Sequence, residues 1–183
     1  SRLYWMTGDE QYKEYAFRLA DQYLLNEDLA AAADLRLIDH GSEIIGGLTE
    51  ACVVAWSEEP DRWARYRPRM KALLDRVLEI GSNPDGMLYV AINPGTGQVT
   101  NKELADTWGY VYNGRLTFSL LDSQPRYREA AARALSNLSK YQGNSWLDKS
   151  ADGYADSIEG ALNLLNRLPD DGVDENLRVH VGL

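Results

Sequence analysis

Hydrophobic positions along this chain fall into two kinds of helical pattern, and the two kinds alternate. Residues 12–24, 60–78 and 125–141 each carry apolar side chains spaced three and four apart, with charged residues opposite. This spacing is typical of amphipathic helices at a protein surface. Thr7-Gly8-Asp9-Glu10 is predicted to form a capping box before the first of them. Pro60 and Pro125 are favoured first-turn residues of the other two.

The second pattern is a helix that is apolar on more than one side, as in residues 44–56, 110–121 and 158–168. Each of these helices follows an acidic residue and carries a glycine near its beginning; the glycines are Gly46, Gly114 and Gly160. Glycine within a helix costs about 1 kcal/mol relative to alanine, so its recurrence predicts close contact between helices. The pattern therefore predicts helical hairpins in two layers, with the glycine-bearing helices inside.

The connections between these helices are unequal in length. Those that lead from an outer to an inner helix are long, at residues 27–38, 82–105 and 144–151, and the return connections are short. Residues 87–92 and 98–100 flank the turn Asn93-Pro94-Gly95-Thr96-Gly97, which predicts a β-hairpin. A fourth outer helix is predicted to begin near residues 173–175. Because long loops carry function more often than tight ones, the working face is predicted at the inner helices' N-terminal ends.

These features resemble a known group of enzymes. The helix entry Trp5-Met6-Thr7-Gly8-Asp9 with Tyr12 and Tyr15 after it, and the Asp-led inner helices, resemble the six-hairpin (α/α toroid) glycosidases, near the unsaturated glucuronyl hydrolases, with α/α-toroid polysaccharide lyases as neighbours. The resemblance spans essentially the whole chain. It implies an all-α domain over residues 1–183 with a carbohydrate cleft at the inner helices' N-termini. The family closes a ring of about six hairpins, so this chain is expected to be about half a toroid, completed by a missing remainder or by another copy.

Two carboxylates are the expected catalytic groups of a glycoside hydrolase at this cleft, namely Asp106 and Asp152. Hydrolysis of a glycosidic bond uses two carboxyl groups, about 5 Å apart in retaining enzymes and 6.5–9.5 Å apart in inverting ones. Aromatic, amide and charged side chains are expected to bind the sugar: Asp39, His40, Glu43, Trp108, Tyr112, Asn113, Arg115, Tyr154 and Asp156. The other interpretation is structural, in which the acidic residues cap helices at a gain of about 1 kcal/mol each and His40 is incidental.

A calcium loop is a further interpretation of one segment. Between Asp148 and Glu159, oxygen-bearing side chains occupy positions 1, 3, 5, 9 and 12, and glycine occupies position 6. The preceding helix is expected to stop at Gly143, however, which is too early for an EF-hand. In the alternative, Asp152 caps the inner helix while Asp156 and Glu159 face the cleft or form hydrogen bonds within the core. No other metal or cofactor is predicted.

Composition limits the class of partner. The chain has 183 residues, 44% hydrophobic and 26% charged, which suits one folded domain. Its net charge of −9 disfavours nucleic acid and acidic membrane surfaces, and no apolar run approaches the roughly 20 residues of a membrane span. Five Trp and eleven Tyr against two Phe suit either stacking on sugars or half-buried helix faces. The single Cys52 is predicted to lie in the core. Carbohydrate is the predicted partner.

Three alternatives to a hydrolase stay open at this point. A polysaccharide lyase would use a Tyr or His to remove the proton beside a uronate, with Asn113 and Arg115 neutralising its carboxylate. A non-catalytic helical-repeat module would bind glycan or protein through the same cleft. A terpenoid cyclase is the least favoured, because the sequence shows no acidic cluster suited to a diphosphate-bound metal.

Overall fold

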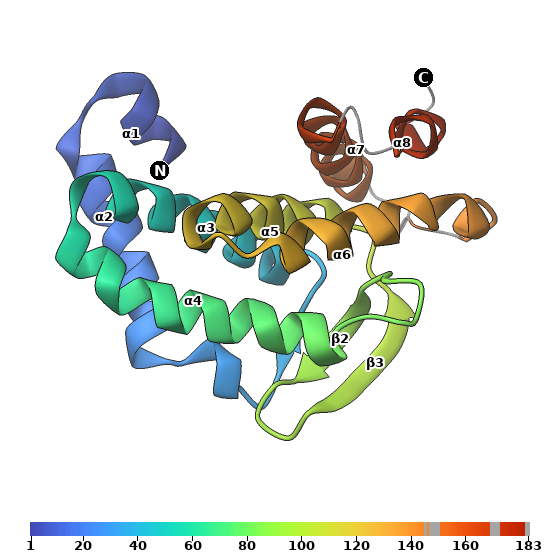
Figure 1. Ribbon diagram of the computed structural model, residues 1–183, viewed down its shortest axis with the longest axis horizontal. Helices are drawn as coiled ribbons and strands as arrows, with labels where there is room; N and C mark the ends of the chain where they lie inside the picture. Colours follow the sequence, from blue (N-terminus) through green and yellow to red (C-terminus); the bar gives the residue numbers. More distant parts are fainter. Residues whose placement is uncertain (145, 147–150, 169–172, 182–183) are drawn as a thin grey trace.

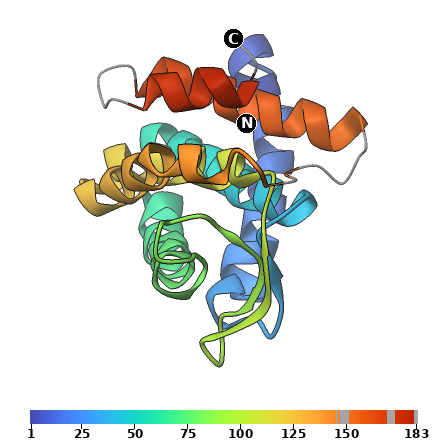
Figure 2. The same ribbon diagram turned by 90° about the vertical axis from the view of Figure 1, so that its right-hand side faces the viewer.

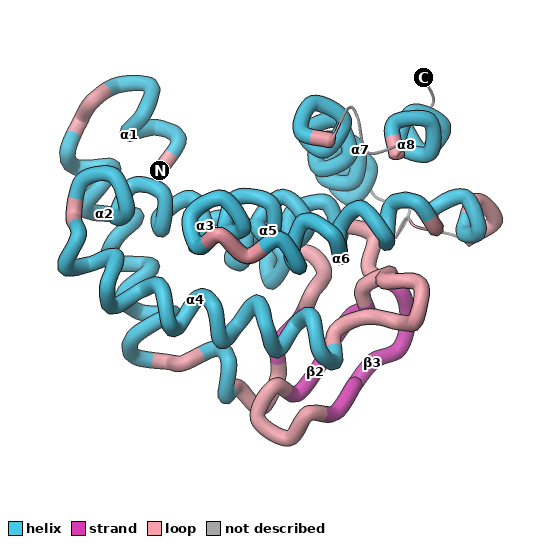
Figure 3. Tube along the Cα trace, in the orientation of Figure 1, coloured by secondary structure: helices cyan, strands magenta, loops and turns pink. Residues whose placement is uncertain are grey.

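The computed structural model describes residues 1–144, 146, 151–168 and 173–181, apart from the side chains of residues 151, 152 and 154. The described residues form a mainly helical protein with one small antiparallel sheet (Figures 1 and 3). The helices are α1 (Arg2–Thr7), α2 (Glu10–Ala20), α3 (His40–Glu58), α4 (Pro60–Ile80), α5 (Trp108–Asp122), α6 (Pro125–Ser136), α7 (Ala151–Arg167) and α8 (Asp174–Val181). Short π and 3₁₀ turns lie at Asp21–Asn26, Leu29–Ala31 and Leu138–Tyr141.

The helices form hairpins across the short connections, so each inner helix pairs mainly with the helix that follows it rather than with the one that precedes it. Consecutive helices pack as the hairpins α3–α4, α5–α6 and α7–α8, and the first members of these hairpins also contact one another, α3 with α5 and α5 with α7. The amphipathic helix α4 begins at Pro60, as the sequence predicts, and Gly81 follows its last residue. The helix at Pro125 ends earlier than expected, at Ser136, and gives way to a 3₁₀ turn.

Helix α3 lies at the centre of the fold because almost its whole circumference is apolar. Ile45, Leu48, Cys52 and Val54 are all buried in the core. Helices α2, α4 and α5 and strand β1 (Leu35–Arg36) surround α3. Burial of each large apolar side chain stabilises the fold by about 1.5–3 kcal/mol relative to exposure.

Two of the three recurrent glycines, Gly114 and Gly160, mark close helix contacts as expected, whereas a Cβ atom on Gly46 would make only an ordinary contact, at 3.6 Å from the Tyr110 backbone oxygen. A Cβ atom placed on Gly109 would lie 2.6 Å from the Cα atom of Gly160, so α5 and α7 touch through their backbones. A Cβ atom on Gly114 would lie 3.3 Å from the Thr49 side chain of α3. Because glycine has no side chain, the inner helices approach each other more closely at these positions than they could if other residues stood there.

The third hairpin is turned relative to the first two. Helices α4 and α6 run across the page in Figure 1, where α7 and α8 are seen nearly end-on, and Figure 2 shows α7 and α8 lengthwise. Gly160, which meets the first turn of α5, is the tenth residue of α7, so the N-terminal half of α7 extends past the crossing. The fold is therefore mainly helical with paired hairpins, and α7 departs from a regular inner row.

The sheet joins the two long connections that precede α3 and α5. Strands β2 (Tyr89–Asn93) and β3 (Gln98–Leu104) form the predicted hairpin, and β1 adds a third antiparallel strand in the order β1-β2-β3. Leu35 pairs with Ile92, and Ile92 pairs with Val99. The backbone N–H of Asp39 donates to Thr107 Oγ1 at 2.9 Å, so the N-terminal ends of α3 and α5 lie together beside this sheet.

One local prediction was wrong, and one further interpretation is not supported. Thr7 does not cap α2, because it is the last residue of α1, and Asp9 instead accepts a hydrogen bond from the Gln11 N–H at 3.0 Å. From Ala151 onward, the positions of the calcium-loop interpretation belong to helix α7, which does not fit an EF-hand loop; Asp148 lies outside the described residues. Within the described ranges, no helix combines the length and hydropathy needed to cross a membrane.

Candidate functional site

A polar cleft of about 540 Å³ opens over α3 and α5, between α1 on one side and α7 on the other. Its volume lies within the range of sites for small molecules, but its lining is more polar than is usual for such sites. Carboxylates, amides, two arginines, hydroxyls and a glycine floor form this lining: Arg2, Glu43, Gly46, Gly47, Thr49, Glu50, Tyr110, Asn113, Gly114, Thr117, Glu159, Asn163, Asn166 and Arg167.

Each inner helix contributes one polar stripe to the cleft. On α3 the stripe is Glu43, Gly46, Gly47 and Glu50, which recur at intervals of three and four residues. The stripe of α5 contains Tyr110, Asn113, Gly114 and Thr117, and that of α7 contains Glu159, Asn163, Asn166 and Arg167. Residues with this spacing share one face of a helix, so three largely apolar helices each present a hydrophilic side to the same space.

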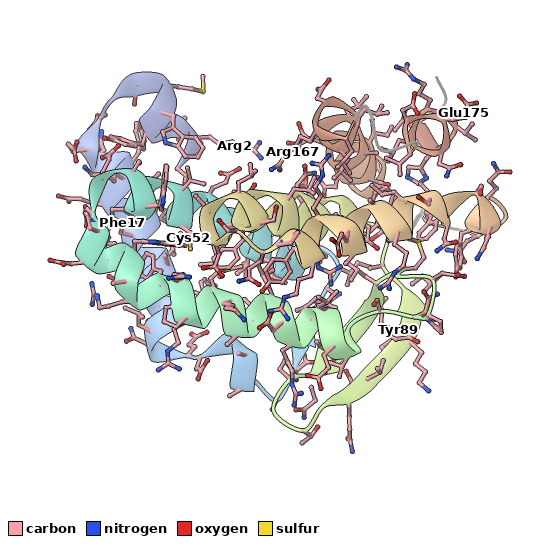
Figure 4. All side chains as sticks on the ribbon, viewed as in Figure 1. Arg2, Phe17, Cys52, Tyr89, Arg167 and Glu175 are labelled. Atoms are coloured by element: carbon pink, nitrogen blue, oxygen red, sulfur yellow. The ribbon has the colours of Figure 1, made fainter. Side chains whose placement is uncertain are left out.

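Arg2, on α1, connects two of the helices that line the cleft. Its Nε donates to Glu50 Oε1 on α3 at 2.8 Å, and its Nη1 donates to Glu159 Oε1 on α7 at 3.2 Å. These ion pairs raise the pKa of the Arg2 guanidinium, mainly through the hydrogen bond to Glu50. Figure 4 shows Arg2 and Arg167 pointing toward one another across the space between α1 and α7.

Tyr110 holds two carboxylates of α7 together. Its hydroxyl lies 3.0 Å from Glu159 Oε2 and 3.1 Å from Asp156 Oδ1, and its single proton can be donated to only one of them at a time. Burial raises the pKa of Tyr110, and the neighbouring Glu159 raises it further. The phenol therefore stays protonated at neutral pH and acts as a hydrogen-bond donor.

Arg167 lies at the opposite end of the cleft. Its Nη1 donates to the Asn113 backbone oxygen at 2.9 Å and to Asn113 Oδ1 at 3.2 Å. Burial lowers the pKa of Arg167, and the charge of Arg128 lowers it further. Within the part of the chain that the structure describes, no carboxylate forms an ion pair with Arg167. The guanidinium can therefore bind an anionic group of a ligand and donate hydrogen bonds to it.

Three of the predicted site residues surround the entrance to α3. Glu43 lines the cleft, and His40 Nδ1 lies 3.0 Å from Glu43 Oε2, although the imidazole itself is exposed. Asp39 precedes α3 with a positive φ of 55° and makes no side-chain hydrogen bond to the helix N-terminus. Neither the Asp39 side chain nor that of His40 lines the cleft.

The predicted residues of α5 divide between the cleft and the core. Asn113 lines the cleft and donates to the backbone oxygens of Gly109 and Gly160 at 2.8 and 3.1 Å. Trp108, Tyr112 and Arg115 are buried instead, and they line neither this cleft nor the apolar groove described below. Arg115 Cζ lies 5.6 Å from the centroid of the Tyr112 ring, and burial lowers the pKa of Arg115.

The two predicted catalytic carboxylates are placed differently. Asp106 is 6% exposed, immediately before Thr107 at the start of α5, and is not among the residues that line the cleft. The side chains of Asp152 and Tyr154 lie outside the described residues. Asp156 lies beside the cleft through its contact with Tyr110. Of the whole predicted set, the structure thus brings Glu43, Asn113 and Asp156 to the cleft or its edge.

Several cleft residues were not identified as site residues from the sequence. Arg2 gives no sequence signal, because its role depends on α1 folding back toward α7. A sequence signal does exist for several others, because they are polar residues that recur at intervals of three and four along largely apolar helices: Glu50, Tyr110, Asn163, Asn166 and Arg167. A count of polar residues at intervals of three and four along each inner helix would have found them.

The described side chains include no group of three or more His, Cys, Asp or Glu residues that could hold a metal ion. Comparison of the chain with known protein families, with curated proteins and with solved structures gave no match.

Proposed function

We propose that the protein acts on carbohydrate, as a glycoside hydrolase, and that the polar cleft binds the saccharide. The observation that carries this proposal is the lining of the cleft: three glutamates, three asparagines, two arginines and a tyrosine hydroxyl converge on one space. A ligand must satisfy these groups when it displaces water, because an unpaired polar group costs about 1–3 kcal/mol. Saccharides carry the dense hydroxyl groups, both donors and acceptors, that such a lining requires.

Glu43 and Glu159 are the carboxylates best placed to act on a glycosidic bond. Both line the cleft from different helices, Glu43 from α3 and Glu159 from α7, and a hydrolase needs two carboxyl groups in one cleft. Arg2 and Tyr110 orient the Glu159 carboxylate. Asp106, the carboxylate that the sequence favours, is buried outside the cleft and would need a rearrangement to reach a sugar.

Arg167 supports a saccharide that carries an anionic group, such as a uronate. A guanidinium that no carboxylate of the described chain neutralises can form a bidentate pair with a ligand carboxylate. The carboxylates of the cleft would repel an anion elsewhere, so the charged group of the ligand is expected at the Arg167 end. A neutral saccharide would leave this charge unmatched.

A lyase reaction at this cleft receives less support. A lyase would need a tyrosine or histidine to remove a proton, and the raised pKa of Tyr110 makes it a poor base.

A non-catalytic binding module has one observation in its favour, since Arg2 already pairs with both Glu50 and Glu159. The (α/α) toroid is likewise proposed as the architecture, supported by the hairpins and by the cleft on the shared face of α3 and α5.

Turnover of a panel of uronic-acid and neutral oligosaccharides, followed by the release of reducing ends, tests the proposal. We expect Glu159→Gln to lower turnover at least 100-fold without changing the circular dichroism spectrum, as is typical for loss of an acid or base. Glu129→Gln, at an exposed position of α6, is the matched control and should behave as wild type. If Asp106→Asn abolishes turnover and Glu159→Gln leaves turnover unchanged, the result would instead support Asp106, the catalytic carboxylate that the sequence favours. Saturable binding without product would support the binding module.

A further inference from the structure

A second cavity, of about 480 Å³, lies beside the polar cleft between α1, α2 and α3. Most of its lining is apolar and includes Leu3, Tyr15, Leu19, Ile44 and Leu48, and charged side chains line only the part next to the polar cleft. Leu3, Tyr15 and Leu19 are 54%, 57% and 44% exposed, which is high for large apolar side chains. We refer to this cavity as the apolar groove.

The apolar groove is continuous with the polar cleft. Arg2, Glu43, Gly47 and Glu50 line both cavities. Gly47 forms the floor at the junction, and no side chain or other segment of the protein comes within 4 Å of the position that a Cβ atom would take there, beyond its own stretch of helix. The two cavities are therefore two ends of one trough, one hydrophilic and one apolar.

Because one end of the trough is hydrophilic and the other is apolar, it favours a ligand with one hydrophilic part and one apolar part. A second sugar in the apolar groove would leave its hydroxyl groups without partners, which costs about 1–3 kcal/mol for each buried group. An aromatic or alkyl group gains about 25 cal/mol for each Å² of apolar surface that it covers. Tyrosine rings such as that of Tyr15 favour a flat aromatic group by offset stacking.

We propose that the apolar groove binds the aryl aglycone of a glycoside whose sugar occupies the polar cleft. The proposal rests on the proposed function and narrows it, because it makes aryl glycosides, rather than long polysaccharides, the preferred substrates. The bond to be broken would then lie near the junction, where Glu43 lines both cavities.

Calorimetric titration of the full chain carrying Glu159→Gln, so that bound glycosides are not hydrolysed, tests this proposal with three probes. The probes are methyl β-D-glucuronide, 4-nitrophenyl β-D-glucuronide and 4-nitrophenol. We expect the aryl glucuronide to bind at least about tenfold more tightly than the methyl glucuronide, from burial of one ring. Leu19→Ser should remove most of this advantage and leave the affinity for the methyl glucuronide unchanged. Leu120→Ser, at a 79% exposed position that lines neither cavity, is the matched control.

The outcomes separate this proposal from the proposed function. Equal affinity for the two glucuronides would overturn the aglycone site and leave the saccharide cleft standing. If 4-nitrophenol binds and neither glucuronide does, the saccharide cleft would be overturned. The proposal that a linked aglycone occupies the apolar groove would then be overturned as well. Binding of none of the three would overturn both. Sedimentation equilibrium adds a further arm, since a dimer that Leu19→Ser dissociates would show that a second copy, not a ligand, covers the groove.

Discussion

At the scale of single residues, glycine has two opposite roles in the inner helices. Gly109 is essential to packing, because a Cβ atom there would lie 2.6 Å from a backbone atom of Gly160. Gly47 has open space at the same position, so packing does not require a glycine there. The two residues lie on neighbouring helices, and they allow the cost of a close contact to be separated from the cost of glycine itself.

We expect Gly109→Ala to lower the free energy of unfolding by at least about 2 kcal/mol, since overpacking against backbone outweighs the gain in helix propensity. Gly47→Ala is expected to raise it by about 0.5–1 kcal/mol through helix propensity alone. Urea titration followed by circular dichroism measures both changes. Equal effects of the two substitutions would mean that α5 and α7 are farther apart than the structure places them.

At the scale of elements, Asp75 links α4 to α6, which are the second helices of two consecutive hairpins. Lys71 Nζ, one turn earlier on α4, donates to Asp75 Oδ2 at 2.6 Å, and Arg126 and Tyr127 of α6 both donate to Oδ1. Burial alone would raise the pKa of Asp75, but these three donors outweigh it and lower the pKa below its usual value. The carboxylate therefore stabilises the α4–α6 contact in its ionised form.

Asp75→Asn should cost about 2 kcal/mol of unfolding free energy at neutral pH, which is typical for hydrogen bonds to a charged group. Because the pKa is lower in the folded state, this stabilisation is present above the unfolded pKa of about 3.9 and is lost as the pH falls through the folded value. The difference between wild type and variant should thus be constant from pH 7 to about pH 5 and shrink below about pH 4. Thermal unfolding across this range, with Glu129→Gln as a neutral comparison, measures the trend. A difference that grows on acidification would contradict it.

The sequence predicts elements better than it predicts how they cross. Local patterns are sufficient for α4, which begins at Pro60 and ends before Gly81, and for the hairpin of β2 and β3. They fail for α1, because Trp5 and Met6 are exposed and no apolar periodicity identifies a helix of six residues. Strand β1 was missed because two residues become a strand only by pairing with β2. The orientation of α7 depends on the Gly109–Gly160 contact, a non-local feature that no local pattern specifies.

The candidate site shows the same limit for a different reason. An acidic residue before an inner helix can cap it or face a ligand, and the sequence does not separate the two. The structure buries Asp106 and brings Glu43 to the cleft. The polar stripes of α3, α5 and α7 are visible in the sequence, but their convergence on one cleft requires knowledge of which helices are neighbours. Arg2 reaches Glu159 across 157 residues of chain, and no local pattern indicates that contact.

At the scale of the whole molecule, one continuous core runs from α2 to α8, and Cys52 lies within it. The thiol is fully buried on α3, and burial raises its pKa, so both access and reactivity are suppressed in the folded state. Because α3 is enclosed by α2, α4, α5 and β1, exposure of Cys52 requires these contacts to open together. The only cysteine of the chain is therefore a reporter of global unfolding.

We expect a thiol reagent to label Cys52 at least about 10³-fold more slowly in the native protein than in the urea-denatured protein, as the stability of a folded domain implies. Under conditions in which refolding outpaces labelling, the free energy from the labelling rate should equal that from circular dichroism. Gly109→Ala, which acts on α5 and α7 rather than on the surroundings of Cys52, should shift both measures equally. The labelling rate could instead exceed the rate calculated from the free energy of unfolding by circular dichroism, and could be unchanged by Gly109→Ala. That result would show that α3 opens locally and that the hairpins do not unfold as one unit.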